Sequence, residues 1–410
     1  MMRYLVILMF CGVGTVFAQE TVRTGADVLA ASNFDRLDGK TVGLIVNHTA
    51  LVDDEHLINL VHAAPNVRVG AIFGPEHGLR GTAEDGEAVS DGKDLLTGAP
   101  VYSLYGATRR PTIEMLAGLD ILIFDIQDVG ARFYTFISTM GLSMQAAAEA
   151  GIPFIVLDRP NPLSGAYVSG FILEPDQESF VGQYAIPIAH GLTVGELASM
   201  IKGDGLMPGL ESLVLEVVPM DGWDRSMQWP DTGRPWVATS PNIPRFDNAL
   251  VYPGTCFFEA TSASEGRGTR TPFLQVGSIK VDGGQIAEAL NNKSLPGVRF
   301  EGVEFTPTPL PNMDSAPKLN GQTIRGLGVT VTDRRIYQPV EVGIHILHAY
   351  YHATPVANQF LTRPQWLAKL SGTSRLLDML SSMTPEAIIA SWENDIATFT
   401  QRSERYYLYD

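Results

Sequence analysis

Val67-Arg-Val-Gly-Ala-Ile-Phe-Gly-Pro-Glu-His-Gly-Leu-Arg80 is the stretch of this chain that decides its fold class. The apolar first half indicates a buried β-strand over residues 67–73. The chain then turns at a Gly-Pro pair and presents a carboxylate, an imidazole and a guanidinium, on Glu76, His77 and Arg80. Polar side chains directly after a buried strand are typical of the ligand-binding edge of an α/β sheet.

Three other apolar runs end in the same way. They cover residues 41–46, 121–124 and 154–157 and are followed by Asn47 and His48, by Asp125, Gln127 and Asp128, and by Asp158, Arg159 and Asn161. The carboxyl ends of parallel strands meet at one edge of a sheet, where α/β proteins bind their ligands. We therefore expect these side chains to gather around an active site.

The order of predicted elements indicates the fold. Helical patterns at residues 55–64, 112–118, 139–150 and 193–202 alternate with the strands. Such alternation predicts an α/β fold with a Rossmann-like, doubly wound and mostly parallel sheet, which we place in residues 22–250. Another strand is expected at 213–218, and residues 85–104 are expected to form a long irregular insertion. Residues 225–275 are rich in Pro, Gly, Ser and Thr, and indicate an inter-domain region.

A smaller α+β domain is expected over residues 251–410. A strand pattern at 326–332 and helical patterns at 339–352, 373–382 and 385–402 indicate it. We expect this domain to complete a cleft with the first one.

Composition and targeting signals limit the classes of function. The chain has 410 residues and a net charge of −16, and no basic patch indicates a nucleic-acid partner. Residues 1–18 have the pattern of a secretory signal peptide, so we expect an exported protein, periplasmic or secreted. No other run is long enough to span a membrane. Only Cys256 remains after cleavage, which leaves no internal disulfide.

Glu76 is the first candidate for a catalytic carboxyl group. Partial desolvation at a strand end beside Phe73 raises a carboxyl pKa and suits a general acid. His77 is a candidate donor to a substrate oxygen, and Asp125 or Asp128 a second catalytic carboxylate. The alternatives are structural: Glu76 capping a helix or paired with Arg80, and Asp–Arg pairs that hold the loops.

The loop Glu259-Ala-Thr-Ser-Ala-Ser-Glu-Gly-Arg-Gly-Thr-Arg270 is polar and shaped by glycines. Arg267 and Arg270 can grip a carboxylate, or can instead pair with Glu259 and Glu265. The loop lacks the ending of a phosphate-binding P-loop, and no dinucleotide fingerprint follows the first strand. Zinc-hydrolase and serine-nucleophile signatures are also missing, so we expect no metal and no cofactor.

The chain resembles the NamZ-type exo-β-N-acetylmuramidases, a family of glycoside hydrolases formerly described as a domain of unknown function. The similar motifs run in order along the mature chain: Gly74-Pro-Glu-His-Gly-Leu-Arg-Gly81, Tyr102-Ser-Leu-Tyr-Gly106, Asp125-Ile-Gln-Asp-Val-Gly-Ala-Arg-Phe-Tyr-Thr135, Leu157-Asp-Arg-Pro-Asn-Pro162, His190-Gly-Leu-Thr-Val-Gly-Glu-Leu197, Ser240-Pro-Asn-Ile-Pro244, Tyr252-Pro-Gly254 and Ser264-Glu-Gly-Arg-Gly-Thr269. The chain departs from the family pattern at Ala189, where the family often has Arg, and at Gly277–Lys280.

The resemblance implies release of N-acetylmuramic acid from the non-reducing end of peptidoglycan fragments, with Glu76 as the catalytic residue. It implies muramyl saccharides as partners and leaves the oligomeric state open. Among the motif residues we expect His190 and Asn242 to bind substrate, and Tyr134 and Trp236 to stack on sugar faces. Arg80, Arg132, Arg267 and Arg270 are candidates to bind the lactyl carboxylate. Asp125, Asp128, Glu259 and Glu265 remain open as the second catalytic group.

Two other functions remain possible from the residues. A periplasmic sugar-binding protein also has two α/β lobes, but binds without turnover. A peptidoglycan amidase or peptidase acts on the same polymer, but the missing zinc and serine signatures disfavour it.

Overall fold

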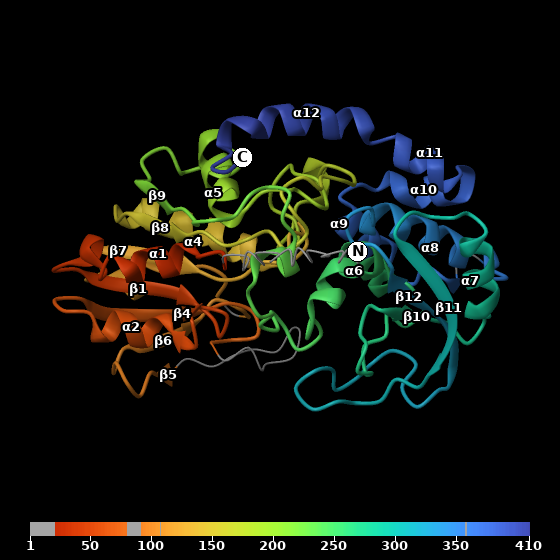
Figure 1. The fold of residues 1–410 in the computed structure, drawn as a ribbon, viewed down its shortest axis with the longest axis horizontal. Helices are drawn as coiled ribbons and strands as arrows, with labels where there is room; N and C mark the ends of the chain where they lie inside the picture. Colours follow the sequence, from red (N-terminus) through yellow and green to blue (C-terminus); the bar gives the residue numbers. More distant parts are fainter. Residues whose placement is uncertain (1–20, 80–91, 107, 357–358) are drawn as a thin grey trace, which may run out of the picture.

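The computed structural model describes residues 21–79, 92–106, 108–356 and 359–410. A seven-stranded sheet forms the first half of the chain, and a smaller, three-stranded antiparallel sheet lies in the second half (Figure 1). The α/β class and the two kinds of sheet agree with the sequence-based prediction.

Six strands of the large sheet are parallel, in the order β6 (Pro100–Ser103), β4 (Arg68–Gly74), β1 (Thr41–Val46), β7 (Ile121–Asp125), β8 (Phe154–Leu157) and β9 (Leu215–Val218). A short antiparallel strand, β5 (Gly92–Lys93), adds to the β6 edge. Numbered along the chain, the parallel strands follow the order 3-2-1-4-5-6 of doubly wound dinucleotide folds, which reverses between β1 and β7.

Both faces of this sheet are buried, which is why its strands are continuous apolar runs. Successive side chains of β1 enter different cores: Ile45 joins the larger core, while Leu44 and Val46 join a separate one. Helices α4 (Phe136–Ala150) and α5 (Val194–Gly203) pack in the larger core, and α1 (Gly25–Ala31) and α2 (Leu57–Ala63) in the other. A short helix, α3 (Ile113–Leu116), precedes β7.

Helix α6 (Phe246–Thr255) and the 3₁₀ segment Cys256–Ala260 lead into the second half of the chain. Its sheet has the order β10 (Gln275–Val276), β12 (Ile324–Val331) and β11 (Val298–Phe305). Its helices are α7 (Gly283–Asn291), α8 (Pro339–Ala353), α9 (Pro364–Ser371), α10 (Arg375–Ser382), α11 (Pro385–Ala390) and α12 (Glu393–Ser403). The expected boundary at residue 250 falls within α6, and the division into domains stays a prediction.

The C-terminal segment returns to the half of the chain that contains the large sheet. Helix α12 runs from α11 back towards α5, and the C-terminus lies beside α5 (Figure 1). Arg402 and Arg405 pair there with the buried carboxylate of Asp204. The last residues therefore tie the two halves together.

The remaining elements are small. They are the hairpin β2 (Leu51–Val52) and β3 (Glu55–His56), and 3₁₀ turns at Asp35–Leu37, Pro175–Gln177, Trp229–Thr232 and Glu404–Tyr406. The helix expected at 55–64 therefore begins as a strand, and the one expected at 385–402 is two helices, α11 and α12. The part of the expected 85–104 insertion that is described contains β5 and β6. None of the described helices has the length and apolar character that crossing a bilayer requires.

Candidate active site

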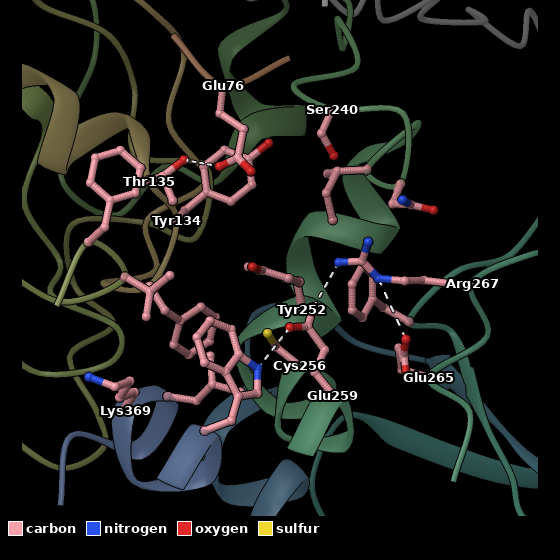
Figure 2. A pocket seen from close by; sticks show the side chains of 18 of the residues that line it. Glu76, Tyr134, Thr135, Ser240, Tyr252, Cys256, Glu259, Glu265, Arg267 and Lys369 are labelled. Carbon is pink, nitrogen blue, oxygen red and sulfur yellow. Dashed lines mark hydrogen bonds and ion pairs between the residues drawn. The ribbon is translucent and has the colours of Figure 1, made fainter. Parts of the chain in front are cut away.

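A cavity of about 610 Å³ lies where the two halves of the chain meet. The first half contributes Glu76, His77, Tyr105, Tyr134 and Thr135, and the second half contributes Tyr252, Glu259, Glu265, Arg267, Lys318 and Trp366. Figure 2 shows the labelled side chains converging from several elements on one space. Its volume is in the range of small-molecule sites.

Glu76 reaches this cavity because the chain turns sharply after β4. His77 and Gly78 have φ angles of 67° and 72°, and the Gly78 amide donates to the Pro75 carbonyl oxygen at 2.9 Å. A left-handed His is unusual and indicates a turn that the surrounding structure imposes. His77 is buried, lines the cavity and contacts the Phe136 ring edge-on, with 6.5 Å between ring centroids.

Two hydroxyl groups hold the Glu76 carboxylate. The Thr135 hydroxyl, just before α4, donates to Glu76 Oε2 at 2.5 Å (Figure 2). Tyr105, which follows β6, also hydrogen-bonds to this carboxylate, and burial together with the Glu76 charge raises the pKa of Tyr105. The segments that follow β4 and β6 and the residue that precedes α4 therefore fix one carboxyl group that faces the cavity.

A chain of charged groups forms the opposite wall. Arg267 donates to Glu259 Oε1 at 2.7 Å and lies 3.6 Å from Glu265, whose other oxygen pairs with Lys318 at 2.7 Å. Burial and the Glu265 charge raise the pKa of Glu259 to about 7. Burial lowers the pKa of Arg267 to about 10, although the charges of Asp314 and Glu76 oppose this shift. The structure thus brings the 259–267 part of the predicted loop to the same cavity as Glu76.

Aromatic rings complete the walls. The Trp366 indole on α9 donates to Glu259 Oε2 at 3.2 Å, and the Tyr134 hydroxyl donates to Thr239 at 2.9 Å. Trp236, expected to stack on a sugar, is instead packed against Trp229, with 5.1 Å between centroids, and does not line the cavity. Trp366, and not Trp236, is the tryptophan that lines the cavity.

Several predicted site residues hold the fold instead. Asp125 is fully buried and makes a bidentate ion pair with Arg159, whose Nε and Nη2 both donate to the carboxylate. Asp158 is also buried and accepts from the Thr193 hydroxyl and the Gly195 amide at the start of α5. Burial raises the pKa of Asp158 to about 7. These residues do not line the cavity, and their contacts are with other parts of the fold, so a contact with substrate stays a prediction for them.

The strand ends at the β1–β7 switch point are closed by hydrogen bonds. The Thr49 hydroxyl donates to Asn47 and accepts from the Gln127 amide, and the Gln127 side chain donates to the Pro160 carbonyl oxygen. Asp128 is buried and accepts from the Gly130 amide at 2.6 Å, and burial raises its pKa to about 7. None of Asn47, Gln127 and Asp128 lines the cavity. The cavity is therefore lined by residues that follow β4 and β6 and by residues just before α4, and not by these side chains at the β1 and β7 ends.

Four further predicted ligand-binding residues also lie outside the cavity lining. Arg132 is fully buried and donates to the carbonyl oxygens of Phe171, Ile186 and Leu370. His190 is buried, and burial and Arg132 lower its pKa to about 3. Asn161 donates to the Leu192 carbonyl oxygen, and His48 hydrogen-bonds to the Ala238 carbonyl oxygen. The polar atoms of these side chains hydrogen-bond to backbone groups of the protein.

Of the remaining predicted site residues, one lines the cavity, one does not, and one lies outside the described residues. Asn242 lines the cavity and donates to the Met313 carbonyl oxygen at 2.9 Å. Arg270 is exposed and does not line it. Arg80 lies outside the described residues, as does the predicted signal peptide. Within the described ranges, no group of three or more His, Cys, Asp and Glu side chains is arranged to hold a metal ion.

Sequence reasoning did not select several residues that the geometry places in the site, among them Tyr105, Thr135, Lys318 and Trp366. Tyr105 and Thr135 stand inside motifs quoted above, so their position next to Glu76 had a sequence signal. Lys318 and Trp366 had none, because they lie far along the chain from the Glu76 motif and outside any polar cluster.

Comparison with known proteins gives matches along nearly the whole chain. Residues 42–247 match the model of the N-terminal part of the exo-beta-N-acetylmuramidase NamZ, and residues 250–409 match that of its C-terminal part. The peptidoglycan beta-N-acetylmuramidase NamZ of Bacillus subtilis (strain 168) is 41% identical over 390 residues, which are 95% of this chain and 91% of the relative.

Two solved structures of DUF1343 family proteins from Bacteroides fragilis NCTC 9343 are also similar. One has a TM-score of 0.87 and 36% identity, and the other 0.80 and 32%. Each comparison covers 95% of this chain and 99% of the solved chain.

Proposed function

The chain belongs to the exo-β-N-acetylmuramidase NamZ family, and we propose that it releases N-acetylmuramic acid from the non-reducing end of peptidoglycan fragments with Glu76 as general acid. One observation supports the role of Glu76 above all others. Its carboxyl group faces the cavity between the halves and is held there by Thr135 and Tyr105. Positioning of this kind lets a carboxylic acid protonate a leaving-group oxygen.

Burial reduces the number of candidates for the second catalytic group. Glycoside cleavage commonly uses two carboxyl groups, or one acid together with the 2-acetamido group of the substrate. Asp125 and Asp128 are closed off from the cavity, whereas Glu259 and Glu265 line it. Both Glu259 oxygens accept hydrogen bonds, from Arg267 and Trp366, and Glu265 is paired with Lys318. These contacts favour a supporting role for the two glutamates and assistance by the substrate acetamido group.

The proposed place of action is outside the cytoplasm. The charged start, apolar core and small-residue cleavage site over residues 1–18 support export to the periplasm or the medium, and so a part in cell-wall recycling. Cell fractionation, followed by N-terminal sequencing of the mature protein, tests this. A mature N-terminus at Gln19 is expected, and retention of Met1 in a cytoplasmic fraction would contradict export.

One assay tests the activity. Mature protein is incubated with a chromogenic β-N-acetylmuramide and with the matching β-N-acetylglucosaminide, and release of the chromophore is followed. We expect turnover of the muramide and little of the glucosaminide. Binding of the muramide without release would instead favour a periplasmic sugar-binding protein.

The role of Glu76 is tested with Glu76→Gln on a natural disaccharide, whose poor leaving group needs protonation. The rate is expected to fall by about 10²–10⁴-fold. A folded variant that keeps full activity on this substrate would exclude Glu76 as the acid.

A further inference from the structure

The charges that line the cavity are unequally paired. Among the residues that the structure describes, five cationic side chains line it, on Arg109, Arg267, Lys318, Arg363 and Lys369. Arg267 and Lys318 are already paired with Glu259 and Glu265. A substrate carboxylate that enters the cavity therefore needs one of the other cations.

Two of those other cations lie at α9, one at its N-cap and one within the helix. Arg363 immediately precedes the helix and Lys369 is in its second half; neither forms an ion pair with a carboxylate in the described ranges. Trp366 and Lys369 are three residues apart within the helix, so their side chains are neighbours on its surface. The Arg363 guanidinium lies 5.0 Å from the Trp366 ring centroid. Figure 2 shows Lys369 across the cavity from Glu76.

Helix α9 is fixed at both ends. The Arg363 amide donates to the Ala260 carbonyl oxygen at 3.0 Å, and the Trp366 indole to Glu259. At the other end the buried Arg132 donates to the Leu370 carbonyl oxygen at 2.9 Å. A ligand-binding group on such a helix is held in place before the substrate arrives, which reduces the entropy lost on binding.

We propose that Arg363 and Lys369 of α9 bind the lactyl carboxylate of the terminal N-acetylmuramic acid and so distinguish it from N-acetylglucosamine. This inference rests on the proposed function. The two sugars differ in the 3-O-lactyl group, whose carboxylate is the one charge that a cation can read. Arg363 supplies a fork that matches a carboxylate, and Lys369 a compact half-buried charge.

The test compares two chromogenic muramides, one with the free lactyl carboxylate and one with the neutral lactyl carboxamide. The ratio of their kcat/KM values measures the preference of the enzyme for the charged lactyl group over the neutral one. For the unaltered protein we expect a preference for the carboxylate of about 10- to 100-fold, as for a charge-assisted hydrogen bond. Arg363→Met and Lys369→Met should each reduce this preference, and the double variant should abolish it.

Matched controls are Arg299→Met and Lys293→Met. These remove exposed cations of the same types from outside the cavity, and should keep the preference. If the α9 variants keep it as well, or if Arg109→Met removes it instead, the inference is wrong. Should an α9 variant not fold, the unaltered protein still decides, because equal kcat/KM for acid and amide would exclude any reading of the charge. If the unaltered protein hydrolyses neither muramide, the proposed function itself fails.

Discussion

Glu76 depends on its neighbours for orientation, and this gives the first prediction. Thr135→Val removes the hydroxyl that donates to Glu76 Oε2 while keeping the shape of the side chain. A hydrogen bond to a charged group contributes about 1.5–3 kcal/mol, so kcat on a natural disaccharide should fall about 10-fold or more. Thr135→Ser keeps the hydroxyl and should retain most of the activity. Full activity of Thr135→Val would show that the hydroxyl does not hold Glu76 for catalysis.

Asp128 gives a prediction about pH. Burial raises its pKa to about 7 in the folded protein, whereas an unfolded aspartate titrates near about 3.9. Between these values the folded state keeps a proton that the unfolded state has lost, so the free energy of unfolding contributed by Asp128 falls as pH rises and levels off above about 7. Asp128→Asn removes this dependence.

The measurement is urea unfolding of both proteins at several pH values. From pH 4 to pH 7 the stability of Asp128→Asn relative to the unaltered protein should improve, by at most about 1.4 kcal/mol for each pKa unit of the shift. A constant difference between the two proteins across this range would contradict a raised pKa. The other buried carboxylates are present in both proteins, so their contributions to the pH dependence cancel in the difference between the two.

Single residues also show where sequence reasoning stops. The position of Glu76 in the site could be predicted from the sequence, because a strand end followed by Gly-Pro exposes the next side chain at the ligand-binding edge of the sheet. Asp125 and Arg132 stand in an equally polar motif, yet Asp125 pairs with Arg159 and Arg132 donates to three carbonyl oxygens. A sequence shows that a charge is present, but not whether it points to solvent, to a ligand or to buried backbone.

At the scale of elements, the parallel strands were the easiest to predict. The runs at 41–46 and 154–157 match β1 and β8, because strands buried on both faces are continuous and apolar. Strand β11 was missed because Arg299, Glu301 and Glu304 are exposed and break its apolar pattern. Helix α9 had signals that were not used: Pro364 at its first position and Gly372 just after its end.

Arg132 links two elements that are distant in sequence, and its removal should be costly. Arg132→Met leaves the carbonyl oxygens of Phe171, Ile186 and Leu370 without their donor. Each buried group left unpaired costs about 1–3 kcal/mol, so we expect a loss of about 3 kcal/mol or more in denaturant unfolding. The control is Arg270→Met, which removes an exposed guanidinium and should change stability by less than about 0.5 kcal/mol. Similar values for both variants would show that Arg132 does not carry the contact between α9 and the first half.

The larger apolar core extends through both halves of the molecule. Phe124 of the large sheet, Tyr252 of α6 and Leu327 of the small sheet all belong to the same buried cluster. The sequence indicated two sheets, but it could not show that one core joins them, because that depends on which faces meet. A site built from both halves therefore depends on their staying packed together, and domains joined by a large apolar interface are not expected to move independently.

The C-terminal residues secure this packing from outside the core. The Tyr409 hydroxyl donates to the buried Asp158 at 2.6 Å and accepts from the Met220 amide, and its ring meets Trp223 edge-on at 5.0 Å. The Leu408 amide donates to Glu196 at 2.9 Å. These contacts lie on the first half of the chain, although the segment arrives through α12 from the second.

Removal of residues 404–410 should therefore destabilise the first half as well as the second. The deletion takes one donor from each of the buried carboxylates Asp158 and Glu196 and uncovers Trp223, whereas Tyr409→Phe removes only the hydroxyl and should cost about 1 kcal/mol. In calorimetry the unaltered protein should unfold in one transition, and the truncated protein in one transition at a clearly lower temperature. The shared core requires that the halves lose their structure together, so a separate transition for the second half would contradict the shared core. A truncated protein that melts like the intact one would show that the C-terminal residues do not stabilise the packing of the two halves.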